Sequence, residues 1–323
     1  MPRDVSVVGP LNVDLLIIGE GPSSFEELTR WEGPADIHMT AAGSVGYLVQ
    51  DLARLGLDVS LVSCLSDDPL GAFVLDALRR AGVDTNRVRL VPDTVCAIGA
   101  YLLLFGSRKR PLTYRLPTHD PWPLAFDLAD LDYLLDARLL HCGGYLHFDS
   151  VYHGATTDLF RRAKARGLIT TIDTQFPLKP LPRPWLAAMA DILPYVDVLF
   201  ADEREARNLA DREELAEAAG LLREAGPPIV VVKEGSEGSS VFTAQGAFHL
   251  PAVRVAPLVD SIGAGDAFDA AFLLGLLEGW PVERTAHFAA VTAGFTVGGV
   301  GGSTAMPARA QVEAYIADLG GAS

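Results

Sequence analysis

Short apolar runs alternate along the chain with longer segments in which apolar residues recur every three or four positions. The short runs cover residues 5–8, 59–64, 139–142, 168–172, 196–200 and 229–232. The longer segments cover about 45–55, 69–80 and 157–165, and Gly56 and Gly82 stand where the first two should end. This alternation predicts strands followed by helices, and hence an α/β protein with a parallel central sheet and helices outside it.

A different pattern interrupts this alternation between residues 94 and 117. Two strand-like runs, 97–105 and 112–116, flank the basic segment 106–110, which is typical of a hairpin. Together with the apolar segments 15–18 and 36–39 they predict a small β-sheet lid, formed by about residues 12–40 and 95–118, within a single domain spanning residues 1–323. The cations at the hairpin tip are either a solvated turn that protects a sheet edge or a lid tip that reaches over an anionic substrate. They are Arg108, Lys109 and Arg110.

Composition narrows the possible functions. The chain has 323 residues, and its 26 Lys and Arg against 41 Asp and Glu give a net charge of −15. Such an acidic protein is not expected to bind nucleic acid or an anionic membrane surface. The 3 cysteines are far apart, which is typical of a reducing compartment and excludes a disulfide scaffold or a closely spaced zinc cluster. With no signal-peptide pattern and no apolar membrane span, we expect a cytoplasmic globular protein.

The strongest candidate for chemistry is the segment 260–268, where a glycine loop leads into an apolar helix. Gly263, Ala264 and Gly265 precede Asp266, and apolar residues then recur at helical spacing. Unpaired N–H groups at a helix start, together with the helix dipole, can hold an anion such as a phosphate. Asp266 is then open to two interpretations. It is either a helix N-cap, or a general base that accepts a hydroxyl proton while the amides stabilise a transferring phosphoryl group.

Other polar residues follow predicted strands, where the carboxyl ends of an open α/β sheet meet solvent. Asn12 and Asp14 follow the first strand and form either a simple turn or part of a ligand site. Asp202 and Glu205 open a helix, where carboxylates complement the dipole, and they could also order water around Mg²⁺. Lys233 ends a strongly β-branched strand ahead of a glycine-containing loop.

These segments, in this order, resemble the ribokinase-like (PfkB) family of carbohydrate and nucleoside kinases over nearly the whole chain. Residues 260–266, Asp-Ser-Ile-Gly-Ala-Gly-Asp, resemble the family's C-terminal signature. The resemblance implies a three-layer α-β-α sandwich with a mostly parallel central sheet and a small β-sheet lid. It also implies that Asp266 is the catalytic base and that the amides of Gly263, Ala264 and Gly265 form an anion hole for the γ-phosphate of ATP.

The same resemblance organises the other candidate residues. The candidate substrate-binding residues are Asn12, Asp14, Ala42, Gly43, Tyr47, Tyr145 and Asp260. The candidate ATP-binding residues are Lys233, Gly235, Gly238 and Gly302. Asp202 and Glu205 stand where the family positions Mg²⁺ and phosphate. Residues 297–307 stand where members have an ATP-side loop and often part of a monovalent-cation site, so K⁺ is a further candidate cofactor.

Two positions depart from the family's pattern. Tyr47 stands where the family's sugar-binding loop has Asn, and it offers a single hydroxyl on a larger side chain. We expect Tyr47 to stack on or close off part of the substrate, or else the pocket to accept something other than the usual sugar. Asp202 stands where the family has Asn, which adds negative charge beside the phosphates and favours a requirement for Mg²⁺.

The predicted function is ATP-dependent phosphorylation of a small sugar or sugar-like polyol. Asp14 would orient hydroxyls, Lys233 would help to neutralise phosphate charge, and the lid would exclude water. Alternatives within the family are a nucleoside kinase, with Tyr47 and Tyr145 against the base, and a phosphosugar kinase that uses the basic lid tip. A non-catalytic binding or regulatory protein on the kinase fold is the alternative from another class, and the retained Asp266 counts against it. Pairing of the lid edge with a second copy makes a homodimer a further hypothesis.

Overall fold

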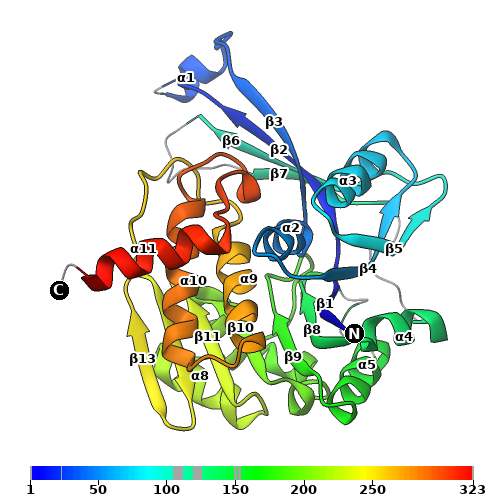
Figure 1. Ribbon diagram of the computed structural model, residues 1–323. Helices are drawn as coiled ribbons and strands as arrows, with labels where there is room; N and C mark the ends of the chain where they lie inside the picture. The colour runs from blue at the N-terminus through cyan, green and yellow to red at the C-terminus, as the bar shows by residue number, and fades with distance from the viewer. Residues whose placement is uncertain are drawn as a thin grey trace.

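The structure, a computed structural model, describes residues 2–22, 24–104, 112–118, 126–148, 151 and 154–321. Its main body is a nine-stranded sheet with helices on both faces, and four further strands form a separate smaller sheet (Figure 1). This is the three-layer α/β architecture with a β lid that the sequence predicts, so the fold class is confirmed. The basic tip predicted at 106–110 lies outside the described residues.

The central sheet is parallel over most of its width. Its order is β13-β12-β11-β10-β9-β8-β1-β4-β5; every pairing from β11 to β5 is parallel, and the pairings of β12 are antiparallel. The strands are β1 (Arg3–Val8), β4 (Val59–Ser66), β5 (Asp84–Val91), β8 (Ala137–Gly143), β9 (Ile169–Asp173), β10 (Val198–Asp202), β11 (Ile229–Lys233), β12 (Ser239–Thr243) and β13 (Gly246–Leu250). The order reverses at β1, because the chain builds outward to β5 and then returns to β8 on the other side. Ligands of open α/β sheets bind beyond the strand carboxyl ends at such a point.

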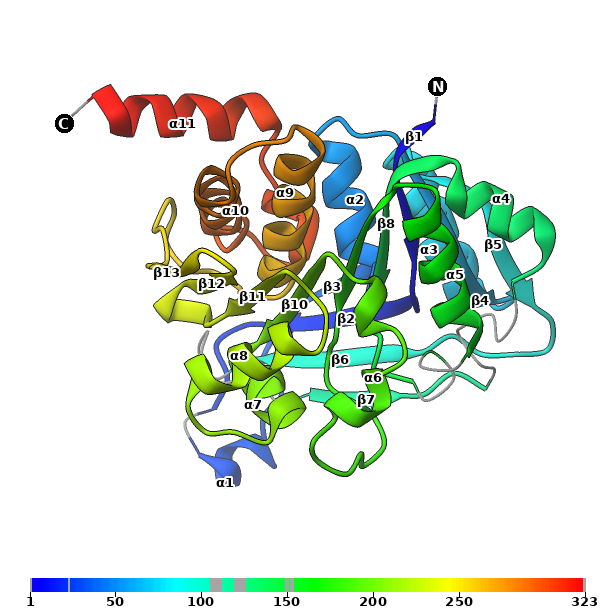
Figure 2. The ribbon, with the colours of Figure 1, turned by 90° about the horizontal axis from the view of Figure 1, so that it is seen from below.

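Each face of the central sheet has its own hydrophobic core, because successive side chains of a strand point to opposite faces. Leu139 belongs to the core on one face and Leu140 to the core on the other. One face carries α2 (Gly46–Arg54), α3 (Pro69–Arg80), α9 (Ala264–Leu277) and α10 (Val282–Thr296), and the other carries α4 (Leu128–Leu135), α5 (Gly154–Ala165), α7 (Glu203–Ala210) and α8 (Leu215–Glu224) (Figure 2). The short helices α1 (Phe25–Leu28) and α6 (Leu186–Met189) lie in connections, and α11 (Arg309–Gly321) packs on α10.

The helix that begins in the predicted signature, α9, is buried along most of its length. The apolar residues that recur at helical spacing after Asp266 include Ala267, Ala270, Ala271 and Leu274; each is 0% exposed, which confirms the predicted apolar helix. The helix packs between α2 and α10 (Figure 2) and ends just before Gly279, whose φ is +67°. Its burial holds the start of the helix in a fixed position. Within the described part of the chain, no helix is both long and apolar enough to cross a membrane.

The smaller sheet forms the lid and has the strand order β3-β2-β6-β7. Its strands are β2 (Asn12–Ile18), β3 (Asp36–Ala42), β6 (Ile98–Leu103) and β7 (Leu112–Arg115). β2 follows β1 after three residues, so the chain passes directly from the middle of the central sheet into the lid. The apolar segment predicted at 36–39 ends too early, because residues 40–42 continue β3 by pairing with residues 12–14 of β2.

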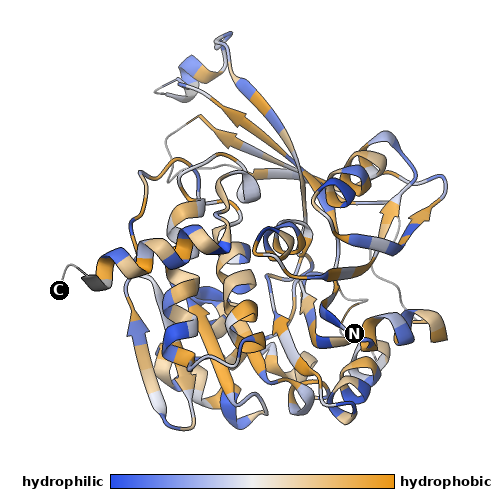
Figure 3. Cartoon of the chain, in the orientation of Figure 1, coloured by the Kyte–Doolittle hydropathy of each residue, from blue (hydrophilic) through white to orange (hydrophobic). Residues whose placement is uncertain are grey.

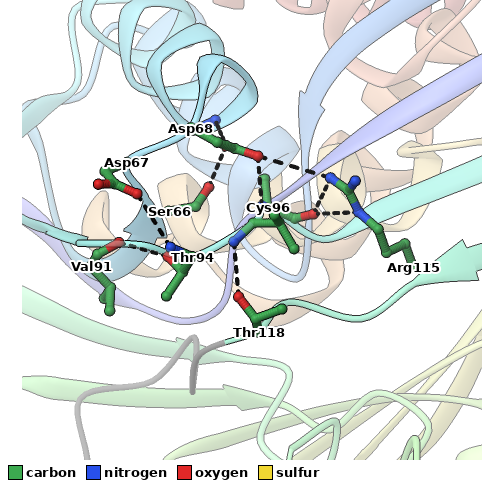
Figure 4. Close-up of polar contacts among 10 residues, drawn as sticks. Ser66, Asp67, Asp68, Val91, Thr94, Cys96, Arg115 and Thr118 are labelled. Atoms are coloured by element: carbon green, nitrogen blue, oxygen red, sulfur yellow. Dashed lines mark hydrogen bonds and ion pairs between the residues drawn. The ribbon is translucent and has the colours of Figure 1, made fainter.

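A polar cluster anchors the lid to the main body (Figure 4). Asp68 caps the start of α3 with one carboxylate oxygen, and the other oxygen accepts from the Cys96 amide at 3.1 Å, just ahead of β6. Arg115, at the end of β7, donates to the Cys96 carbonyl at 2.8 Å. Asp67 accepts from the Thr94 amide at 3.3 Å. These bonds hold the base of the lid against α3, so that its strands reach over the sheet from a fixed point.

Candidate active site

Several of the predicted site residues come together at the carboxyl edge of the central sheet. β9 ends at Asp173, β10 at Asp202 and β11 at Lys233, and these strands are neighbours in parallel register. Gly265, at the start of α9, faces this edge, because a methyl group added there would lie 3.6 Å from Lys233 Nζ. The lid brings Asp14 close enough for its charge to act on Asp266 of α9. Residues far apart in sequence therefore meet where the fold predicts a ligand.

Asp266 occupies the third position of α9 and not its capping position. The N-cap is Gly263, which is in the left-handed conformation with φ +76°, and no side chain among the described residues caps this helix end. The N-cap interpretation of Asp266 is therefore wrong. The first amides of a helix have no acceptor within the helix itself. Here they lie beside Asp266 at the positive end of the helix dipole.

Two backbone segments shape the glycine loop ahead of α9. Asp260 is 2% exposed; one of its oxygens accepts from the Ile262 amide at 3.0 Å and the other from the Gly301 amide at 3.1 Å. A methyl group on Gly263 would lie 2.5 Å from Gly302 Cα, so the two loops pack backbone against backbone. Asp260 thus joins the loops, and its expected contact with a substrate stays a prediction. The expected monovalent cation at this loop also stays a prediction.

The surroundings of Asp266 favour its neutral form. Burial raises the pKa of this carboxyl well above its usual value, while the Lys233 ammonium opposes the shift. The nearby carboxyl groups of Asp173, Asp51 and Asp14 raise the pKa of Asp266 further. The side chain is only half-buried, so a ligand at the edge of the sheet can reach it. A shifted pKa with a specific charge partner at a ligand site is typical of a general acid or base.

Lys233 is paired with carboxylates of the protein itself. Its ammonium lies 2.8 Å from Asp269 Oδ2 and 3.3 Å from Asp173 Oδ2. Burial alone would lower the pKa of Lys233, but Asp173 and Asp269 raise it above its usual value. The predicted role of Lys233 is to neutralise phosphate charge, and Asp173 and Asp269 are not among the predicted site residues. The available signals were the position of Asp173 at a strand end and that of Asp269 one helical turn beyond Asp266.

Asp202 and Glu205 form a capping box at the start of α7. Asp202 Oδ1 accepts from the Glu205 amide at 2.7 Å, and Glu205 Oε2 accepts from the Asp202 amide at 2.8 Å and from the Thr174 hydroxyl at 3.1 Å. Burial raises the pKa of Glu205, and the charges of Asp173 and Asp202 add to this. Among the described residues, there is no group of three or more Asp, Glu, His or Cys side chains that could hold a metal ion by itself. Because the carboxylates of Asp202 and Glu205 already accept hydrogen bonds from the protein, they fit a Mg²⁺ ion that is held through water and takes phosphates as its other ligands.

The predicted acceptor side is built around Asp14, which is 4% exposed. Asn12 Nδ2 donates to Asp14 Oδ1 at 3.0 Å, and the Tyr47 hydroxyl donates to Asp14 Oδ2 at 3.1 Å. Gly99 of β6 leaves room for this carboxylate, because a methyl group there would lie 2.8 Å from Oδ1. Asn12 Oδ1 is buried and has no hydrogen-bond partner within the described part of the chain. It is therefore an acceptor available to a bound ligand.

The remaining candidates shape the backbone or the core. Ala42 is fully buried, and Gly43 has φ +104°, with space too tight for a side chain beside the backbone of residues 10–12. Tyr145 is 1% exposed within the core on the α5 and α7 face, which does not suit an aromatic wall for a ligand. Gly238, with φ +115°, closes the turn after β11, whereas a methyl group on Gly235 would meet no described atom within 4 Å. A ligand can therefore approach the backbone at Gly235.

The chain is similar in sequence and in fold to known carbohydrate kinases. A family model described as pfkB family carbohydrate kinase matches residues 3–309. The chain is 26% identical over 334 aligned residues to the 5-dehydro-2-deoxygluconokinase of Geobacillus kaustophilus (strain HTA426), which covers 98% of this chain and 94% of that protein. It is 29% identical over 296 residues to the ATP-dependent ribose-1-phosphate kinase of Halopiger xanaduensis (strain DSM 18323 / JCM 14033 / SH-6), covering 91% and 93%. The structure of Arabidopsis thaliana ribokinase complexed with ribose and ATP has the same fold, with a TM-score of 0.80 at 23% identity over 97% of this chain and 98% of that one.

Proposed function

The chain belongs to the pfkB family of carbohydrate kinases and is therefore a phosphotransferase that acts on a sugar hydroxyl, and from this premise we propose the donor, the acceptor class and the catalytic base. The donor is ATP, the acceptor is a small sugar or sugar-like polyol, and the base is Asp266. One observation supports the base most directly: Asp266 stands in the first turn of α9, whose N-cap is the left-handed Gly263. The carboxylate and the unpaired helix amides thus share one helix end.

In this proposal the carboxylate and the amides act on opposite partners of the transfer. The ionised carboxylate of Asp266 accepts the proton of the attacking hydroxyl; its raised pKa makes this carboxylate a stronger base, and the Lys233 ammonium favours the ionised form. The amides of residues 263–265 stabilise negative charge on the transferring phosphoryl group. Asn12 and Asp14 orient the acceptor, because a buried carbonyl oxygen and a carboxylate both accept hydroxyl protons. Lys233 offsets the charge of the buried carboxylates beneath the loop.

We infer that Mg²⁺ accompanies ATP and is held through water by Asp202 and Glu205. When bound, the ion neutralises phosphate charge and orients the phosphates. Because the pKa of Glu205 is raised, this carboxyl would give up a proton when it supports the ion. The protein backbone of the turn 235–238 approaches the nucleotide, since a methyl group on Gly235 would meet no described atom within 4 Å and the space beside this residue is open.

The acceptor alternatives differ in how well the described residues support them. A nucleoside kinase needs an exposed aromatic wall, but Tyr47 and Tyr145 are 4% and 1% exposed, which favours a sugar. A phosphosugar kinase needs a cation near the acceptor, and the candidate tip 106–110 lies outside the described residues. The names of the relatives include both a sugar-acid kinase and a sugar-phosphate kinase, so acceptors of both classes belong in the assay.

A coupled ADP-release assay over sugars, sugar acids, sugar phosphates and nucleosides tests this proposal. We expect turnover with at least one small sugar-like acceptor, and Asp266→Asn should lower kcat about a thousandfold because general base catalysis contributes on that order. Calorimetry should show unchanged ATP binding by Asp266→Asn, and a melting curve checks that the variant folds. Full turnover by Asp266→Asn contradicts the base. Tight binding of one acceptor with no turnover of any would favour the non-catalytic protein.

The outer face of the lid supports a proposal about assembly. Ile37 and Met39 of β3 are 64% and 41% exposed. They pair in register with Ile17 and Leu15 of β2, so the four side chains share one face, and Figure 3 shows apolar colouring along these strands. We propose that two copies pack through this face as a homodimer. Analytical ultracentrifugation should show a dimer that Ile37→Lys with Met39→Lys converts to a monomer; a monomeric wild type contradicts the proposal.

The cysteines bear on the compartment. Cys64, Cys96 and Cys142 are all buried and none of them forms a disulfide bond, which is consistent with the reducing cytoplasm that we propose.

A further inference from the structure

Tyr47 joins the acceptor side of the site to the glycine loops. Its hydroxyl lies 3.1 Å from Asp14 Oδ2 and 2.6 Å from Thr40 Oγ1, both on lid strands. At its other end the ring lies against Gly302, where an added methyl group would overlap two ring atoms, and 3.5 Å from the position of a methyl group on Gly263. One side chain thus contacts both the residue that orients the acceptor and the loops around the phosphoryl group.

The direction of the hydrogen bonds at Tyr47 follows from the available protons. Burial and the charge of Asp14 raise the pKa of Tyr47, so the phenol keeps its single proton. An ionised carboxylate only accepts, so Tyr47 donates to Asp14, and its oxygen accepts from Thr40. The second oxygen of Asp14 accepts from Asn12. Donors from the protein therefore engage both oxygens of Asp14.

We propose that Tyr47 selects the acceptor, because its hydroxyl occupies the place at Asp14 that an acceptor hydroxyl would otherwise take and its ring fills the space beside it. This inference rests on the kinase function proposed above. The favoured acceptor therefore directs one hydroxyl fewer toward Asp14 than an acceptor would direct toward the same carboxylate in a site with no bond from Tyr47. An acceptor that carries the extra hydroxyl must displace the phenol, and the displaced polar group then loses its buried partners.

The ring of Tyr47 has little freedom to move aside. It is 4% exposed and is flanked by Gly302, which has φ +51° and lies against Gly263. The Ser303 hydroxyl donates to the Tyr47 carbonyl at 3.4 Å, which ties the same turn of α2 to the 3₁₀ turn Gly302–Ala305. Displacement of the ring therefore also disturbs the loops that hold the phosphoryl group. The wrong acceptor is expected to lose kcat as well as affinity.

The test measures kcat/KM for pairs of acceptors that differ by one hydroxyl, a sugar and its deoxy counterpart. Tyr47→Asn should raise the ratio of kcat/KM for the hydroxylated acceptor to that for the deoxy acceptor by about tenfold or more. Tyr47→Phe keeps the ring and should shift the ratio less but in the same direction. Tyr133→Phe is the matched control, because this tyrosine loses a hydrogen bond to the Asp84 carbonyl far from the site and should leave the ratio unchanged. An equal loss for both acceptors in Tyr47→Asn, with an unchanged ratio, overturns the inference.

A binding measurement separates this inference from the proposed function. Acceptor-induced shifts in melting temperature, recorded without ATP for the same pairs, report selectivity even if no turnover occurs. A wild type that turns over no acceptor refutes the proposed kinase function. The inference on Tyr47 is then decided by the melting temperatures: it holds if the variants change which acceptor of a pair stabilises the protein more, and it fails if they do not. An unchanged preference in Tyr47→Phe, the variant that best preserves the core, overturns it even if Tyr47→Asn fails to fold.

Discussion

The Lys233 ammonium lies 2.8 Å from Asp269 Oδ2, one turn of α9 beyond Asp266. It also lies 3.3 Å from Asp173 Oδ2 at the end of β9, and its side chain is only 17% exposed. One cation thus holds two carboxylates beneath the glycine loop. Because like charges in one site raise each other's pKa, this cation is what allows several carboxylates to gather at the same edge of the sheet.

Replacing Lys233 with Met should shift the pH dependence of activity. The ammonium lowers the pKa of Asp266, so its loss should raise that pKa further and move the acid limb of kcat/KM to higher pH. The variant should also lose stability by about 3 kcal/mol, since removing one partner of a buried ion pair leaves an uncompensated charge. A pH–rate profile and a denaturant titration measure the two effects.

Lys233→Arg is the matched control, because it keeps the charge at this position. It should retain the acid limb of the wild type within the error of the profile. A limb that stays in place in Lys233→Met would mean that Lys233 does not act on the catalytic base. A limb that moves equally in both variants would point to a general disturbance of the site.

The strands of the central sheet could be predicted because a strand buried on both faces is apolar at nearly every position, as in residues 229–232 of β11. β5 was not predicted. It is an edge strand with Asp84, Asn86, Arg87 and Arg89 among its eight residues, so no apolar run marks it. The end of β3 was also missed, because small residues at 40–42 favour a loop until the partner strand is known.

Some residues of the candidate site could likewise be predicted from the local sequence, and others could not. Gly263 and Asp266 are close in sequence, so the order of residues is enough to identify them. Asp173 and Asp269 matter because Lys233 lies between them, and only the register of the strands and the packing of α9 bring the three together. The contacts of Tyr47 likewise depend on two lid strands that fold over α2, which no local pattern encodes.

Glu205→Gln should separate metal binding from stability. The amide keeps the shape of the capping box and removes a carboxyl whose raised pKa disfavours its charged form in the folded state. Stability at pH 7 should therefore be equal or higher, while the Mg²⁺ concentration for half-maximal activity should rise about tenfold, as expected for loss of a supporting ligand. Glu203→Gln is the control, since Glu203 pairs with Arg207 on the same turn but lies outside the box. An unchanged Mg²⁺ requirement in Glu205→Gln contradicts its assignment to the ion.

Gly302→Ala should disturb both sides of the site at once. A methyl group there would overlap the Tyr47 ring, and φ +51° disfavours a side chain in any case. Gly279→Ala isolates the second effect, because its φ is +67° but a methyl group would meet no described atom within 4 Å. We expect Gly302→Ala to lower the free energy of unfolding by about 1–3 kcal/mol more than Gly279→Ala does, and to raise the acceptor KM. An equal loss of unfolding free energy in the two variants would show that the Tyr47 ring moves aside for the methyl group with no measurable loss of stability.

The buried carboxyl of Asp51 should make the protein less stable as pH rises from about 4 to about 8. Asp51 lies in α2, is 0% exposed, and neither oxygen has a hydrogen bond of normal geometry to any described residue. Burial raises the pKa of Asp51 to about 8, although the nearby Ser303 hydroxyl opposes the shift. The unfolded chain releases this proton near pH 4 and the folded protein only near pH 8. Between these values the folded state binds more protons, so the free energy of unfolding falls as pH rises.

Asp51→Asn removes this titration and keeps the size of the side chain. Its stability gain over the wild type should be small at pH 4.5 and grow by about 1 kcal/mol per pH unit up to about pH 8, measured by denaturant unfolding across that range. Asp158→Asn is a control of opposite sign: Arg162 and Arg161 lower the pKa of Asp158, so its stabilising contribution is lost only as pH falls below about 4. The difference between Asp158→Asn and the wild type should therefore stay constant from pH 5 to pH 8. A constant difference for Asp51→Asn over the same range would show that Asp51 is already ionised in the folded protein.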